Sequence, residues 1–70
     1  MVLKQVTIKK PHATYTEMKA LAELLQSDTI KNNGRIVVQC DLEVEIKDIR
    51  KQIKELLNVN YSDITCVYLN

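Results

Sequence analysis

The stretch DTIKNNGRIVVQCD, residues 28–41, decides how this chain is predicted to fold. Asn33-Gly34 is the strongest short hairpin signal in it, because both residues tolerate the positive φ that a type I′ turn needs. Pairing across this turn places residues 29–32 beside residues 35–38. Ile30 is the only apolar residue of the first arm, so the alternative stays open that the glycine ends a loop or a lengthened helix. The hairpin gives a sheet of four strands, and the loop gives a sheet of three.

The residues at the start of the chain predict a strand. Residues 2–9 alternate, with Val2, Val6 and Ile8 on one side and mostly polar side chains on the other. Such alternation is typical of a strand with one buried face. Pro11 then stops the strand.

A helix is predicted after this strand. Thr14 and Glu17 match the capping box, in which the hydroxyl and the carboxylate each satisfy a backbone N–H at the start of a helix. From Met18 to Leu25, apolar residues recur at spacings of three and four, which indicates a stripe that faces a core. We expect the helix to end near Ser27.

Two periodicities compete after the turn. Apolar residues alternate without a break from Ile36 to Ile46, which alone would indicate one very long strand. A helical stripe also begins near residue 43, and strands usually run about five or six residues. Acidic residues precede basic ones in this region, an order that suits a helix dipole. We therefore predict a strand at 35–41, a helix at 44–57, a loop at 58–62 and a final strand at 63–70.

The resulting order, β-α-β-β-α-β, resembles the ferredoxin-like split βαβ arrangement over the whole chain. The resemblance implies one α+β domain, residues 1–70, with an antiparallel or mixed sheet and two helices on one face. Its strands have the spatial order 4-1-3-2, so residues 28–32 and 63–70 form the two edges. Without the hairpin, the prediction becomes a three-stranded βαβαβ unit. The resemblance concerns element order and length alone, and it points to no activity.

Composition and charge narrow the function classes. Seventy residues with a net charge of +1 and 46% hydrophobic residues indicate a small globular chain without strong attraction to nucleic acid or acidic membranes. The apolar runs are too short for a membrane-spanning helix, and the N-terminus lacks a secretory signal. Two cysteines without such a signal point to a reducing compartment, so we expect a cytoplasmic protein. The Lys-, Asn- and Ile-rich composition is compatible with a bacterial or phage origin.

No residue pattern supports catalysis, a metal or a cofactor. Cys40 and Cys66 lie in predicted strands that strand 1 separates, roughly 10 Å apart at ~4.8 Å per strand. That separation is too large for a disulfide. His12 is the only histidine and there is no C-x-x-C pair, so a zinc site lacks ligands. His12 also has no third group to orient it as a base, and we therefore predict a non-enzyme without catalytic residues, metal or cofactor.

Two groups of basic residues suggest anionic partners. One group lies opposite the apolar stripe of the second helix and comprises Lys47, Arg50, Lys51 and Lys54. It forms either a solvated face or a docking surface for an acidic partner. A nucleic-acid patch is the runner-up for function, and its candidate residues are Lys4, Lys9, Lys10, Lys31 and Arg35. The uncovered sheet face lacks the aromatic pairs with which RRM domains stack bases, which weakens this second hypothesis.

The final segment, DITCVYLN, is apolar on both of its faces. Apolar residues on the uncovered face of a small sheet, next to an unpaired strand edge, are a liability that native proteins usually cover. We predict that a second copy, with a dimer favoured, or a partner strand added by β-augmentation covers this surface. The protein is thus interpreted as a small interaction or regulatory module. Its predicted interaction surface comprises Leu3, Val37, Thr65, Val67 and Leu69.

Overall fold

The Asn33-Gly34 turn joins two antiparallel strands, β2 (Thr29–Asn32) and β3 (Arg35–Cys40), in the computed structural model, which describes residues 3–41 and 43–69. Both turn residues have positive φ, 51° at Asn33 and 78° at Gly34, as a type I′ turn requires. The hairpin prediction is therefore confirmed. The three-stranded alternative is wrong, because these local turn preferences outweigh the weak apolarity of the first arm.

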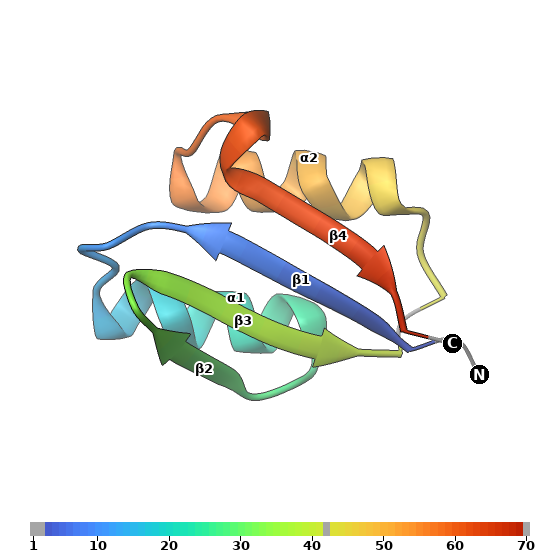
Figure 1. Ribbon diagram of the computed structural model, residues 1–70, viewed down its shortest axis with the longest axis horizontal. Helices are drawn as coiled ribbons and strands as arrows, with labels where there is room; N and C mark the ends of the chain where they lie inside the picture. The colour runs from blue at the N-terminus through green and yellow to red at the C-terminus, as the bar shows by residue number, and fades with distance from the viewer. Residues whose placement is uncertain (1–2, 42, 70) are drawn as a thin grey trace.

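A four-stranded antiparallel sheet forms one layer of the molecule (Figure 1). Its first strand, β1 (Lys4–Lys9), lies between β3 and the C-terminal strand β4 (Ile64–Tyr68), and the order across the sheet is β2-β3-β1-β4. The two edges are therefore β2 and β4. The predicted strand over residues 2–9 is found within its bounds, while Val2, Leu42 and Asn70 lie outside the described residues.

The first helix, α1 (Tyr15–Leu25), begins at the predicted capping box. The Glu17 N–H donates to the Thr14 hydroxyl at 3.2 Å, and the Thr14 N–H donates to the Glu17 carboxylate at 3.0 Å. The helix ends two residues before the predicted position at Ser27. Gln26 adopts a left-handed conformation with a φ of 54°, which closes the last turn through its N–H.

The second helix, α2 (Ile46–Leu57), is shorter at its start than predicted. Glu45 is extended, with φ −63° and ψ 144°, so the helix begins after it and not at residue 44. Asn58 ends the helix in the left-handed region at a φ of 55°. The predicted loop contains a short 3-10 turn, η1 (Tyr61–Asp63). Across residues 3–41 and 43–69, no helix has the length and apolarity needed to cross a bilayer.

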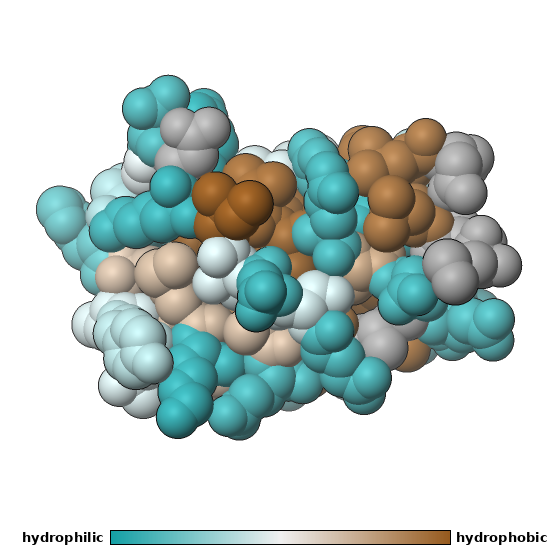
Figure 2. Space-filling view, turned by 90° about the horizontal axis from the view of Figure 1, so that it is seen from below, coloured by the Kyte–Doolittle hydropathy of each residue, from teal (hydrophilic) through white to brown (hydrophobic). Residues whose placement is uncertain are grey.

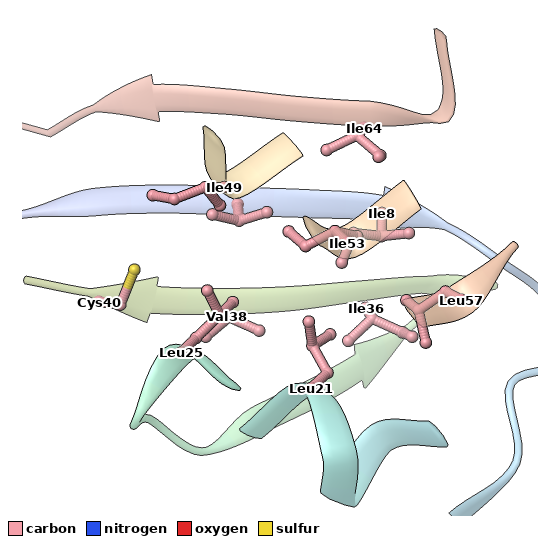
Figure 3. Packing of buried hydrophobic residues seen from close by; sticks show 11 residues of the cluster. Ile8, Leu21, Leu25, Ile36, Val38, Cys40, Ile49, Ile53, Leu57 and Ile64 are labelled. Carbon is pink, nitrogen blue, oxygen red and sulfur yellow. The ribbon is translucent and has the colours of Figure 1, made fainter. Parts of the chain in front are cut away.

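Both helices pack on the same face of the sheet and bury an aliphatic core against it. Figure 3 shows Leu21 and Leu25 of α1 pointing at β3, and Ile49 and Ile53 of α2 beside β1. Alternate residues of the strands complete the core, so the sheet has a covered face and an open one. The strand residues of the core are Val6, Ile8, Ile36, Val38, Cys40 and Ile64.

Loss of the Thr14 hydroxyl leaves the Glu17 N–H in the first turn of α1 without its acceptor. We predict that Thr14→Ala lowers the free energy of unfolding by about 1 kcal/mol, measured by urea denaturation. Thr16→Ala is the matched control, because Thr16 is exposed in the same turn. Equal losses of stability in the two variants would contradict the capping role.

Candidate protein-interaction surface

The open face of the sheet carries all five residues of the predicted interaction surface. Strand register places Val37, Thr7 and Thr65 in one row across β3, β1 and β4, and Gln5 and Val67 in the next. The Leu69 N–H continues the ladder by donating to the Leu3 carbonyl at 2.9 Å. The structure therefore brings the predicted residues together on one surface: Leu3, Val37, Thr65, Val67 and Leu69.

The apolar residues of the open face form two areas with polar side chains between them. Val67 and Leu69 are 44% and 43% exposed at the β4 side. The Gln39 amide donates to the Gln5 side-chain oxygen at 3.2 Å across the middle of the sheet. Figure 2 shows this division, with two separate brown areas along the upper side of the view.

Ile30 is an exposed apolar residue of the open face that the predicted interaction surface does not include. It pairs with Val37, so both lie on the open face, and Ile30 is 65% exposed. The signal was present in the sequence, because a two-residue Asn33-Gly34 turn places position 30 directly opposite position 37. The open face thus carries exposed apolar side chains on both of its edge strands, β4 and β2.

The five residues of the candidate nucleic-acid patch lie on different parts of the molecule. Lys4 is only 3% exposed, and its ammonium group lies 5.8 Å from the centre of the Tyr68 ring. Lys9 and Arg35 are register partners at the other end of β1. Lys31 pairs with the buried Ile36, so it lies on the covered face of the sheet, whereas Lys9 and Arg35 lie on the open face.

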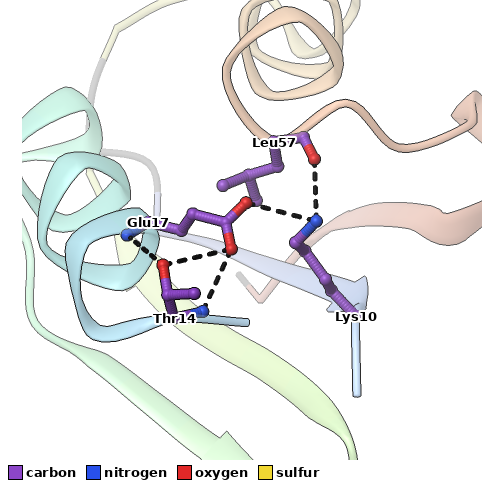
Figure 4. Close-up of polar contacts among 4 residues, drawn as sticks. All are labelled: Lys10, Thr14, Glu17 and Leu57. Carbon is purple, nitrogen blue, oxygen red and sulfur yellow. Dashed lines mark hydrogen bonds and ion pairs between the residues drawn. The ribbon is translucent and has the colours of Figure 1, made fainter. Parts of the chain in front are cut away.

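Lys10, the fifth residue of that patch, joins separate parts of the fold (Figure 4). Its ammonium group donates to the Leu57 carbonyl at 3.0 Å and lies 3.2 Å from the Glu17 carboxylate. Its backbone N–H donates to the Gly34 carbonyl at 3.1 Å. These contacts connect the end of β1 with the β2–β3 turn, the start of α1 and the end of α2.

A second basic surface, here called the basic ridge, consists of Lys47, Arg50 and Lys54 of α2. The Arg50 guanidinium and the Lys54 ammonium each lie 5.5 Å from the centre of the Tyr61 ring, a cation–π distance. Arg50 also donates to the Tyr61 carbonyl at 2.9 Å. Lys47 lines a shallow hollow with Arg50 and Tyr61, and it lies 3.5 Å from the Glu45 carboxylate. The sequence suggested the lysines but not Tyr61, which joins them through tertiary contacts.

The two cysteines are free thiols on the covered face of the sheet. Cys40 is buried, and Cys66 lies two strands away with β1 between them. Burial raises the pKa of the Cys66 thiol, and Cys40 adds to this, whereas Lys4 and Arg50 oppose it. A thiol with a raised pKa is a poor nucleophile at neutral pH. Within the described part of the chain, no three His, Cys, Asp or Glu residues come close enough to hold a metal ion.

Comparison with protein-family models, curated proteins and solved structures found no match to this chain.

The Lys10–Glu17 contact predicts a specific pH dependence of stability. The Thr14 N–H and then the Lys10 ammonium hold the pKa of Glu17 below its ordinary value of 4.5. A lowered pKa in the folded state stabilises the fold above the unfolded value, and this contribution is lost as pH falls through the folded pKa. The stability difference between wild type and Glu17→Gln should thus shrink as pH falls from neutral to below 4.5. Glu23→Gln on the same helix is the control, and a pH-independent difference for Glu17→Gln would contradict the prediction.

Proposed function

We propose that this protein is a small non-enzymatic interaction or regulatory module that self-associates through the open face of its sheet, with a dimer as the favoured state. The observation that carries this proposal is the exposure of Ile30, Val67 and Leu69 on a face that neither α1 nor α2 covers. Apolar side chains gathered on an open sheet face mark an interaction site. The two free cysteines support a reducing, cytoplasmic location.

The same proposal includes a ferredoxin-like arrangement of the chain. It is supported by the strand order β2-β3-β1-β4, which reads 4-1-3-2 from the β4 edge. The position of both helices on one face supports it as well. This arrangement has a functional consequence, because it leaves one whole face of the sheet for a partner.

The size of the open face indicates how strongly two copies would associate. Four strands at ~4.8 Å and about five residues at ~3.3 Å each give a footprint of roughly 300 Å². A stable dimer usually buries about 800 Å² on each partner. We therefore expect reversible association that depends on protein concentration, and not an obligate dimer.

Nucleic-acid binding is the alternative function. Lys9 and Arg35 support it, because they are register neighbours at one end of the open face. Lys4 and Lys10 support it less, since Lys4 is buried and Lys10 binds Leu57 and Glu17. A mobility-shift assay with a short single-stranded DNA at two salt concentrations tests it, because phosphate contacts lose affinity steeply as salt rises.

Val67→Lys tests self-association directly. The variant should sediment as a monomer at concentrations where wild type forms dimers, because a charged side chain would have to be desolvated in the interface. It should still fold, since Val67 is 44% exposed. Leu56→Lys is the matched control, because Leu56 is 41% exposed on α2, away from the open face. Wild type that stays monomeric at high concentration, or equal behaviour of the two variants, would rule the proposal out.

A further inference from the structure

The two edges of the sheet differ in how they are protected against pairing with another strand. β2 has four residues and carries the charged Lys31, whereas β4, with the sequence ITCVY, has no charge, proline or glycine. Short length and charged residues are the usual means by which edge strands avoid pairing. Among the described residues, β4 pairs only with β1, in an unbroken register. β4 is therefore the edge that is open to a further strand.

The backbone groups that β4 offers at this edge follow from its ladder with β1. The Leu69 N–H donates to Leu3. Because these directions alternate along a strand, the N–H and C=O groups of Cys66 and Tyr68 point away from β1. The carbonyl of Ile64 points the same way, while its N–H bonds to the Tyr61 carbonyl. An added strand thus finds two donors and three acceptors.

The basic ridge lies on the side of α2 that is turned toward this edge. Ile49 and Ile53 face the core, and Leu56 lines the groove that α2 forms with α1. At 100° per residue, Lys47, Arg50 and Lys54 project on the side of the helix opposite to Leu56. Tyr61, which both Arg50 and Lys54 contact, comes three positions before the first residue of β4. On its covered side the open edge is therefore bordered by the three cations of the basic ridge, whereas Glu43 and Glu45 lie beside its Tyr68 end.

The positive charge of the basic ridge determines which kind of strand can pair with β4. If β4 of a second copy paired here about a two-fold axis, the two α2 helices would lie side by side with their basic ridges facing each other. Like charges at such an interface are unfavourable. A strand with carboxylates on its helix-side face would instead place them beside Lys47, Arg50 and Lys54.

We propose that the β4 edge binds an extended acidic peptide segment by β-augmentation, with the carboxylates of alternate residues contacting the basic ridge. The proposal rests on the proposed function as an interaction module, and it names a partner for a surface other than the open face. Residues of the peptide opposite Ile64, Cys66 and Tyr68 point to the helix side. The first two are the acidic positions, because Glu43 and Glu45 lie beside Tyr68. The intervening residues lie beside Thr65 and Val67, where apolar side chains fit.

The probe is a fluorescein-labelled peptide of sequence Thr-Thr-Val-Asp-Val-Asp-Thr, which places Asp opposite Cys66 and Ile64 when it runs antiparallel to β4. It is titrated with the wild-type protein at low and moderate salt. We expect saturable binding that weakens with salt. We also expect the amides of Cys66 and Tyr68 to exchange with deuterium about tenfold more slowly in the complex, because they become hydrogen-bonded. A peptide with Lys in place of Asp, and one N-methylated at the Asp residues, should not bind.

Charge reversal provides the matched variants. The double variant Lys47→Glu/Lys54→Glu should bind the peptide about tenfold more weakly or worse, since two attractive charge pairs become repulsive. Lys19→Glu with Lys31→Glu makes the same change in net charge away from the β4 edge, on α1 and β2. This control should weaken binding by less than about threefold through the overall field.

Several outcomes would overturn the inference. These are absence of binding, equal losses in both double variants, tight binding of the lysine peptide, and protection of β2 amides in place of Cys66 and Tyr68. Protection of these two amides by raised protein concentration alone would identify a second copy as the occupant. Sedimentation of the same samples separates the hypotheses, because open-face dimers without peptide binding refute only the edge site. Monomers that bind the acidic peptide refute only the self-association.

Discussion

The placement of both helices on one face of the sheet is the constraint on which the remaining properties of this molecule depend. Alternate residues of β1, β3 and β4 bury aliphatic side chains against α1 and α2. Because successive side chains of a strand point to opposite faces, the same strands expose their other residues on the open face. Residues 3–41 and 43–69 contain no third α-helix that could cover that face. A single layer of helices therefore creates the core and the candidate interaction surface together.

Lys10 connects the end of α2 with the start of α1 on the covered side of the sheet. Its ammonium group lies between the carbonyl at the end of α2 and the carboxylate at the start of α1. A cation near a helix C-terminus and an anion near an N-terminus are both favourable with respect to the helix dipoles. Since Lys10 and Glu17 each retain some exposure, the contact contributes modestly to stability, and it mainly sets the relative position of the helix ends. It also explains why a basic residue of the candidate nucleic-acid patch is engaged within the fold.

Local signals in the sequence predict most of the fold and part of the candidate site. The Asn33-Gly34 turn and the Thr14–Glu17 capping box act over a few residues, so their elements are found where the sequence indicates them. The start of α2 was misjudged because strand and helix periodicities overlap near Val44. The contacts of Lys10 with Leu57 and of Arg50 with Tyr61 join residues that only tertiary structure brings together. No local pattern encodes such pairs. The sequence therefore predicts the basic residues of α2, but not their contacts with Tyr61 or their position beside β4.

The open face and the β4 edge are distinct surfaces, yet a partner bound at one would change the area of the other. A strand added beside β4 would extend the sheet and place its own apolar residues next to Thr65 and Val67. The open face would grow by about a quarter, since one strand would join the four of the sheet. Because the footprint of four strands is small for a dimer interface, this added area would favour the proposed self-association. By linkage, self-association would then favour peptide binding equally. An uncharged β4 would thus couple the two proposed associations into one stronger assembly.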